Sequence, residues 1–161
     1  MAWSAPRTWV AGETVTAAVM NAHVRDNLKA IGDAWTSWTP TLSQGVSTNI
    51  AKTVNYAKYV AAGKLIICTL KLSPTAAGTA GSAITVTLPV TAASSAFFMG
   101  SGAYQDASPA NNYPSIVYLN STTTLALFRS DVSWSNAVGA DPNIAVASGD
   151  VFYASFTYEG A

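Results

Sequence analysis

Few residues of this sequence could carry out acid–base or nucleophilic chemistry. The 161 residues include one histidine, His23, and one cysteine, Cys68. His23 is distant in sequence from any serine or cysteine suited to be its nucleophile, so a catalytic triad is not expected. One Cys and one His also cannot supply the ligands of a zinc site. The sequence therefore predicts no catalytic residue, no metal site and no cofactor.

The acidic residues leave one further enzymatic possibility. A glycoside hydrolase needs two carboxyl groups that face each other across a sugar. The chain has eight candidates: Glu13, Asp26, Asp33, Asp106, Asp131, Asp141, Asp150 and Glu159. Asp106, Asp141 and Asp150 lie among turn residues, where aspartate is common for backbone reasons. We therefore expect no enzyme and keep a polysaccharide hydrolase only as the weakest alternative.

Aromatic residues offer a different chemistry, the binding of sugars. The chain contains five tryptophans, and aromatic residues make up 11% of it. Tyr113, Trp134 and Asn136 lie in segments rich in Asn and Ser between expected strands. Aromatic rings stack on sugar faces, while nearby amides and hydroxyls bind sugar hydroxyls. These three residues are the glycan-binding candidates; the alternative is that such aromatics cap the β domain or fill a subunit interface.

Charge and hydropathy favour a protein that is part of an assembly. Eight basic residues balance eight acidic ones, whereas a nucleic-acid-binding protein would usually be basic. So few charges, with a mean hydropathy of +0.25, indicate that surface is buried in an oligomer or a larger particle. No apolar stretch approaches the roughly 20 residues of a membrane-spanning helix. The first residues lack the apolar core of a signal peptide, so we expect synthesis in the cytoplasm.

One amphipathic helix is expected near the N-terminus. Residues 14–31 contain neither Pro nor Gly, Thr16 suits the N-cap, and Gly32 suits a left-handed C-cap. The helix would have about 15 residues and a length of roughly 22 Å. A narrow apolar stripe along it consists of Ala17, Met20, Val24, Leu28 and Ile31. A lone helix of this length is marginal, so it packs either on its own β domain or, as we favour, on copies of itself.

From residue 35 the pattern changes to short apolar runs with a period of two. Strands are expected at 54–60, 64–72, 83–88, 97–104, 115–119, 124–129 and 151–158, with turn residues between them. Seven or eight short strands without intervening helices predict an antiparallel, jelly-roll-like β-sandwich. Cys68 lies in an apolar run and is expected to be buried. The predicted organisation is an N-terminal arm and assembly helix at 1–34, followed by a mainly β domain at 35–161.

The segment from Trp9 to Leu28 reads WVAGETVTAAVMNAHVRDNL. It resembles an N-terminal segment of bacteriophage minor tail, tail-fibre and head-fibre proteins, particularly from phages of actinobacteria. The pattern there is W-x-x-G-E/D-x-V-T-A-x-x-x-N-x-H-V-R-D-N-L. Residues 38–42 (WTPTL) and 84–89 (ITVTLP) are similar to that family as well. The resemblance thus covers residues 9–89.

The resemblance implies a structural protein of the virion that forms a homotrimer through its N-terminal helices. The arm would attach to other virion proteins of the tail or capsid through Trp3, Arg7 and Trp9. The β domain would be held outward, with the loops around 111–114 and 133–136 as candidates for contact with host-surface glycans. A short fibre, spike or decoration protein suits this length. A free-standing carbohydrate-binding module is the alternative from another class.

Overall fold

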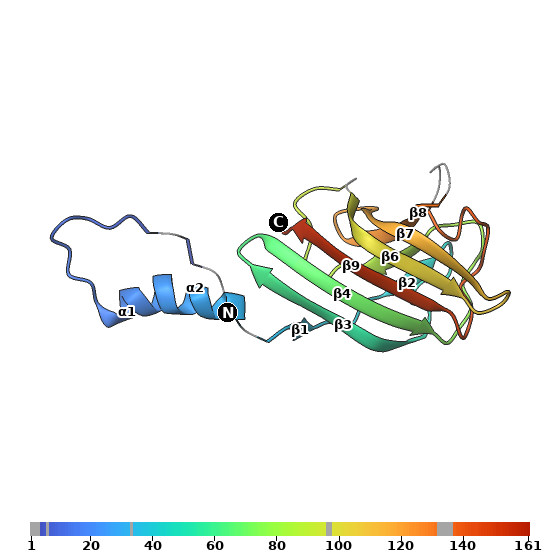
Figure 1. Ribbon diagram of the computed structural model, residues 1–161, viewed down its shortest axis with the longest axis horizontal. Coiled ribbons are helices and arrows are strands. Elements are labelled where there is room, and N and C mark those ends of the chain that lie inside the picture. The colour runs from blue at the N-terminus through green and yellow to red at the C-terminus, as the bar shows by residue number, and fades with distance from the viewer. Residues whose placement is uncertain (1–3, 6, 33, 96–97, 132–136) are drawn as a thin grey trace.

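The computed structural model describes residues 4–5, 7–32, 34–95, 98–131 and 137–161. These residues form an N-terminal helical segment followed by an antiparallel β-sheet (Figure 1). The prediction of a mainly β protein with one N-terminal helix is therefore confirmed. Within the described ranges, no helix is long and apolar enough to cross a bilayer.

The helical segment consists of α1 (Ala17–Met20), the π-helical η1 (Asn21–Arg25) and α2 (Asp26–Gly32). Thr16 caps it as predicted, because its Oγ1 accepts a hydrogen bond from the Val19 N–H at 3.3 Å. The π-helical turn was not anticipated. The prediction of a left-handed cap at Gly32 is wrong: Gly32 is the last residue of α2 and is not among the glycines with positive φ.

Nine strands form one antiparallel sheet in the order β1-β3-β4-β9-β6-β7-β8-β5-β2. They are β1 (Thr36–Ser37), β2 (Leu42–Gln44), β3 (Lys52–Ala62), β4 (Leu65–Pro74), β5 (Ile84–Thr87), β6 (Phe98–Asp106), β7 (Asn111–Leu119), β8 (Thr124–Arg129) and β9 (Val151–Glu159). The seven strands from β3 to β9 lie where the sequence predicted strands. The two short ones, β1 and β2, were not predicted.

The two edges of the sheet are joined by one short connection. β1 pairs with β3 at one edge and β2 with β5 at the other, and only residues 38–41 separate β1 from β2. Five Cα steps span at most about 18 Å, so the sheet has to curl until its edges approach. The Trp38 backbone N–H donates to the Ala57 carbonyl at 3.1 Å, and its indole N–H donates to the Thr87 carbonyl at 3.4 Å.

This curl corrects the predicted two-layer sandwich. Hydrogen-bonded pairing runs without interruption from β1 to β2, so the domain is a single curled sheet, a half-barrel. The core lies inside the curl. Along β4, buried Ile66, Cys68, Leu70 and Leu72 alternate with outward-facing side chains, as the period of two in a strand requires.

The helix and most of the long loops lie at opposite ends of the molecule. The helical segment lies on the side of the turn between β3 and β4, and α2 contacts β3 (Figure 1). The β4–β5 connection, the β6–β7 turn and the segment preceding β9 lie at the other end (Figure 1). The antiparallel register agrees, because Leu65 pairs with Glu159 near one end and Leu72 with Phe152 near the other.

Cys68 is fully buried, as predicted. Burial raises the pKa of its thiol from 9.0 to about 12, since a thiolate in the core would lose its hydration. Burial likewise raises the pKa values of Tyr104 and Tyr158 above the ordinary tyrosine value of 10.0. These three groups stay protonated in the fold at a pH where they ionise in the unfolded chain.

Stability is therefore expected to fall at alkaline pH. Above pH 9.0 the unfolded chain loses the Cys68 proton before the folded chain does. The thiol's contribution is thus complete below pH 9.0 and is lost progressively up to about pH 12. Urea denaturation across this range should show a shallower decline for Cys68→Ala than for the wild type between pH 9.0 and 10.0, before the tyrosines ionise. Equal slopes for the two proteins would contradict this account.

Candidate functional site

The N-terminal arm folds back along the helix. The Ser4 N–H donates to Asn27 Oδ1 at 3.0 Å, and the Ser4 carbonyl accepts from Asn27 Nδ2 at 3.1 Å. Ser4 Oγ donates to the Ala22 carbonyl at 2.7 Å, and His23 Nδ1 lies 3.2 Å from the Ala5 carbonyl. Asn27 is buried, with 9% of its surface exposed. His23 and Asn27 therefore hold the arm against the helix.

A tight turn connects the arm to the helix. The Glu13 N–H donates to the Val10 carbonyl at 3.1 Å, and the Glu13 carboxylate accepts from the Val10 N–H at 3.3 Å. Gly12 has φ +82°, a backbone conformation that favours glycine. The same carboxylate forms an ion pair with Arg7. Gly12, Glu13, His23 and Asn27 all belong to the phage-like segment, and each has a role within this chain.

The three predicted attachment residues have different surroundings. Arg7 is occupied within the chain, because it pairs with Glu13 and lies 5.1 Å from the ring centroid of Trp9. Trp9 is 44% exposed, so much of its surface is free to contact another protein. Trp3 lies outside the described residues. Attachment through these residues stays a prediction, with Trp9 the best placed for it.

The predicted apolar stripe of the helix is uncovered in the single chain. Met20 is 42% exposed, Val24 39% and Leu28 65%, and Ala17 is exposed as well. The side chain of Ile31 is outside the described part of the structure. Although α2 contacts β3, the chain's own β domain does not cover these side chains. They form an apolar surface that is open to a partner.

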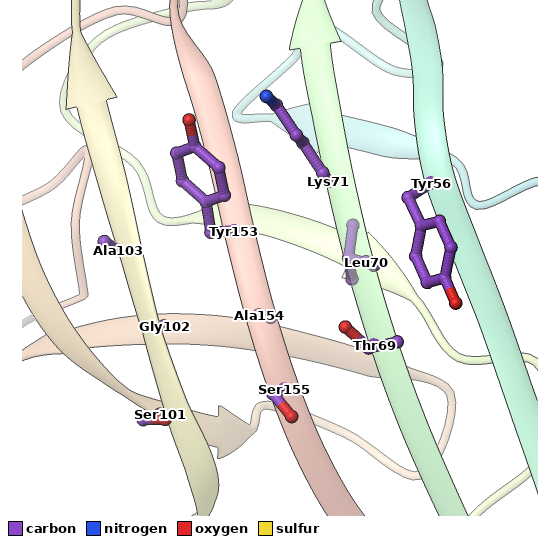
Figure 2. Close-up of a pocket in the computed structure, with 10 residues that line it drawn as sticks. All are labelled: Tyr56, Thr69, Leu70, Lys71, Ser101, Gly102, Ala103, Tyr153, Ala154 and Ser155. Carbon is purple, nitrogen blue, oxygen red and sulfur yellow. The ribbon is translucent and has the colours of Figure 1, made fainter.

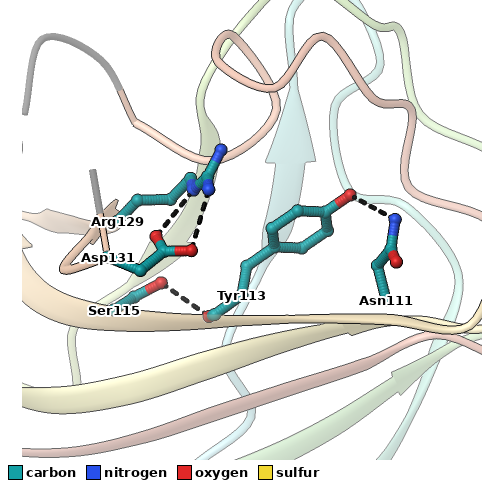
Figure 3. A network of polar contacts seen from close by, with 5 residues as sticks. All are labelled: Asn111, Tyr113, Ser115, Arg129 and Asp131. Carbon is teal, nitrogen blue, oxygen red and sulfur yellow. Dashed lines mark hydrogen bonds and ion pairs between the residues drawn. The ribbon is translucent and has the colours of Figure 1, made fainter. Parts of the chain in front are cut away.

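Tyr113 lies in strand β7, and the expectation that it occupies a polar loop is wrong. The β6–β7 pairing extends to Asp106 opposite Asn111, which makes Asn111 the first residue of β7. Tyr113 is only 9% exposed, and its hydroxyl accepts from Asn111 Nδ2 at 3.3 Å (Figure 3). The Arg129 guanidinium lies 5.5 Å from its ring centroid. Little of the ring is left for a sugar.

Arg129 is itself fixed beside Tyr113. Its Nε and Nη2 donate to the two carboxylate oxygens of Asp131 at 2.9 and 2.8 Å (Figure 3). Below them, Ser115 Oγ donates to the Tyr113 carbonyl at 2.8 Å. Both Tyr113 and Arg129 are thus engaged in contacts within the chain. The other two glycan-binding candidates, Trp134 and Asn136, lie outside the described residues.

A trough lies on the outer face of β3, β4, β9 and β6, among side chains that could bind a ligand (Figure 2). Its first row crosses the four strands as Tyr56, Lys71, Tyr153 and Ala103, because each is the register partner of the next. Figure 2 shows Lys71 between the two tyrosine rings. The hollow has a volume of about 450 Å³.

Small residues make the floor of the trough. The second row runs from Thr69 through Ser155 to Ser101 on neighbouring strands (Figure 2). These short side chains leave the sheet backbone near the surface, whereas Tyr56 and Tyr153 in the first row rise above it. The trough therefore offers aromatic faces at its sides and hydroxyl groups at its base.

The trough is cationic. The ammonium of Lys71 lies 5.3 Å from the ring centroid of Tyr153, and that of Lys58, opposite Thr69, lies 5.4 Å from the ring of Tyr56. No residue that lines the trough is acidic. Across the described part of the chain, neither of the two lysines forms an ion pair. Two positive charges thus face solvent without a counter-charge.

Two of the turn carboxylates accept hydrogen bonds within the chain. Asp150 accepts hydrogen bonds from the Tyr104 hydroxyl and from two backbone N–H groups, and Asp106 accepts from the Ser108 N–H at 3.0 Å. Both therefore stabilise turns. Within the described ranges, no group of three or more His, Cys, Asp and Glu residues could hold a metal ion.

The trough residues were not identified from the sequence. Tyr56, Lys71 and Tyr153 each occupy an outward position of an expected strand, but nothing in the sequence indicates that β9 lies between β4 and β6. Comparisons with protein-family models, with curated proteins and with solved structures give no match. The likeness of residues 9–89 to phage virion proteins therefore stays a prediction from the sequence.

Proposed function

We propose that this protein is a structural component of a bacteriophage virion, a short fibre, spike or decoration protein of the tail or head. It is made in the host cytoplasm and joins the particle through its N-terminal arm and helix. The observation that carries the proposal is the exposed apolar stripe on a helix whose sequence resembles phage assembly segments. In one chain the stripe is uncovered, because the side chains of Met20, Val24 and Leu28 are exposed.

The arm and helix support assembly because their polar and apolar residues are separated. The polar side chains of the segment satisfy one another, as His23 and Asn27 do with the arm. The apolar side chains face outward, and Val10 and Val15 are also exposed, at 69% and 48%. Exposed apolar surface of this kind marks a protein interface. A narrow stripe suits a coiled-coil seam between copies of the helix, and a homotrimer is the proposed state.

The arrangement of the helix and the sheet at opposite ends of the molecule suits the display of the β domain. The turn between the arm and α1 forms the end farthest from the sheet, whereas the β6–β7 turn lies at the opposite end (Figure 1). Trp9, which directly precedes the turn closed by Val10 and Glu13, is the proposed contact with a neighbouring virion protein. Attachment at the helix end would hold the β domain away from the particle, where it could meet glycans of the host surface.

The oligomeric state tests this proposal. We expect light scattering to give the mass of a trimer at micromolar concentration, and Val24→Asp with Leu28→Asp to give a monomer. Each aspartate would place a charge in an apolar seam at a cost of about 2–4 kcal/mol. The matched control is Ala18→Asp with Ala22→Asp, which adds the same charge at exposed helix positions outside the stripe and should leave the trimer intact. A wild-type monomer would overturn the proposal.

A free-standing carbohydrate-binding module is the second candidate, and the trough with its two tyrosines is the observation that favours it. This alternative requires neither the helix nor a second copy. A chain without residues 1–33 distinguishes the two candidates. If the protein is a free-standing module, the shortened chain binds sugar as tightly as the full chain does, and both chains are monomers. The virion proposal instead expects the full chain to be an oligomer and the shortened chain a monomer.

A further inference from the structure

We infer that the outer-face trough binds an extended anionic polysaccharide, with Tyr56 and Tyr153 as stacking rings and Lys58 and Lys71 as the cations that select it. The inference deepens the proposed function, and it rests on that function for the biological source of the ligand, a host-surface glycan. The binding itself depends on the β domain alone. All four residues lie on β3, β4 and β9.

The spacing of the aromatic rings favours a chain over a single small molecule. Tyr56 and Tyr153 occupy one row, with β4 between their strands. Neighbouring strands lie about 4.8 Å apart, so the two tyrosines are separated by roughly 10 Å. Tyr56 is 43% exposed, which leaves its ring accessible from outside. A ligand that contacts both tyrosines must lie across the strands, as successive rings of a polysaccharide can.

The charges determine which polysaccharide fits. Each lysine ammonium lies near a tyrosine ring, 5.4 Å from its centroid for Lys58 and 5.3 Å for Lys71, and so is close to a sugar that contacts the exposed part of that ring. An ammonium has three donors and no acceptor. In the absence of acidic lining residues, these donors are free for carboxylate or phosphate groups of a ligand. The hydroxyls of Thr69, Ser101 and Ser155 can bind sugar hydroxyls at the floor.

A second copy of the chain is a less suitable occupant. The exposed residues of the arm and helix that could contact another copy are apolar, such as Trp9, Val10 and Leu28. The trough presents the cation of Lys71 and a hydroxyl floor, with the cation of Lys58 beside Tyr56, and covering these with apolar groups would leave them without hydrogen-bond partners. An anionic chain matches both the charge and the hydroxyl groups.

The test is a calorimetric and NMR titration of the full-length protein with defined oligosaccharides. The probes are a galacturonate hexamer, its fully methyl-esterified neutral form and a phosphorylated mannose oligomer, each at up to millimolar concentration. We expect one or both acidic probes to bind, with amide shifts on β4 and β9, and the neutral form not to bind. Which acidic probe binds distinguishes a carboxylate source from a phosphate source. Equal binding of the galacturonate and its neutral form, or no binding by either acidic probe, overturns the inference.

Variants locate the site. Tyr153→Ala should weaken binding about tenfold through the lost ring contact, and Lys71→Gln should weaken it about tenfold at low salt and less at high salt. Lys64→Gln is the matched control, because Lys64 lies at the β3–β4 turn beside Glu159, with its side chain 70% exposed. The Lys64→Gln variant should bind the acidic probe as tightly as the wild type does. Equal effects of the two lysine variants would overturn the assignment, provided that both melt as the wild type does.

The two proposals can fail separately. A wild-type monomer would remove the trimer but would leave the oligosaccharide titration unaffected. Conversely, a trimer that binds no acidic probe would retain the assembly proposal and overturn the trough. If the Val24→Asp/Leu28→Asp monomer binds an acidic probe and the trimer does not, the trough is covered by a neighbouring copy and is not a glycan site of the assembled protein.

Discussion

Gln44→Ala is expected to lower the free energy of unfolding by about 3–5 kcal/mol. Gln44 is a buried polar residue, with 1% of its surface exposed. Its Nε2 donates to the Ile144 carbonyl at 2.7 Å and to the Ser82 carbonyl at 3.1 Å, while its Oε1 accepts from the Val146 N–H at 2.8 Å. One side chain thus satisfies three backbone groups on two loops that are far apart in the sequence.

Alanine at this position would leave those three groups without partners and would also open a cavity. The surroundings cannot easily fill it, because they are already in close contact with the glutamine. A Cβ on Gly139 would lie 2.7 Å from Gln44 Nε2 and 2.5 Å from the Ser82 carbonyl oxygen. Gly139 also has φ +102°, so a larger residue there would be strained. The loops and the glutamine are therefore fitted to one another.

Urea denaturation of three variants separates the two causes. Gln44→Met keeps most of the volume and removes the hydrogen bonds, so its loss measures mainly the unsatisfied backbone groups. Gln105→Ala is the control, because Gln105 is an exposed residue of β6 and should change stability by less than about 0.5 kcal/mol. If Gln44→Ala were no less stable than Gln105→Ala, the loops would not depend on Gln44 in the way that its contacts indicate.

The local elements of this fold could be predicted because their periodicity is clear. The alternation of Ile84, Val86 and Leu88 with threonines indicates a strand, and Thr16 indicates the start of a helix. β1 and β2 could not be predicted, since two or three residues are too few to show a period. The curl of the sheet depends on these two strands, because β1 and β2 end the sheet at opposite edges. The sequence therefore indicated the mainly β class but not the curl of the sheet.

The turn chemistry of Asn and Asp misled the interpretation of Tyr113. Asn111 and Asn112 are typical turn residues, yet the turn of this hairpin lies before them, at residues 107–110. The strand then begins at Asn111 and carries Tyr113 into the core. The trough was missed for a different reason. Lys71 and Tyr153 meet only because the last strand, β9, inserts between β4 and β6, and strand order is not visible in a local pattern.

Asp150→Ala is the second substitution with a large expected effect, a loss of about 3–4 kcal/mol. Asp150 is 1% exposed and accepts hydrogen bonds from the Tyr104 hydroxyl, from the Ala107 N–H at 2.9 Å and from the Ala147 N–H at 2.7 Å. Tyr104 is fully buried, so its hydroxyl would be left in the core without a partner. The carboxylate thus joins the β6–β7 turn to the segment that precedes β9.

A double-mutant cycle tests whether the buried pair is the source of this loss. Tyr104→Phe removes only the hydroxyl, and we expect it to cost about 1–2 kcal/mol. In the double variant the two losses should not add, because the tyrosine hydroxyl has no carboxylate to lose once Asp150 is gone; a coupling energy of about 1 kcal/mol or more is expected. Asp131→Ala, which breaks a surface ion pair with Arg129, should cause a much smaller loss. Strict additivity would place the cost in the two backbone N–H groups.

Asp150 also offers a check on the division of the molecule into an assembly end and a display end. It stabilises loops at the end of the sheet opposite the helix (Figure 1), and the three hydrogen bonds described above come from residues outside the apolar stripe and the trough. Conditions under which Asp150→Ala is still folded should therefore leave the oligomeric mass and the affinity for acidic oligosaccharides unchanged. A variant that loses stability together with either property would show that the loops, the helix and the trough depend on one cooperative structure.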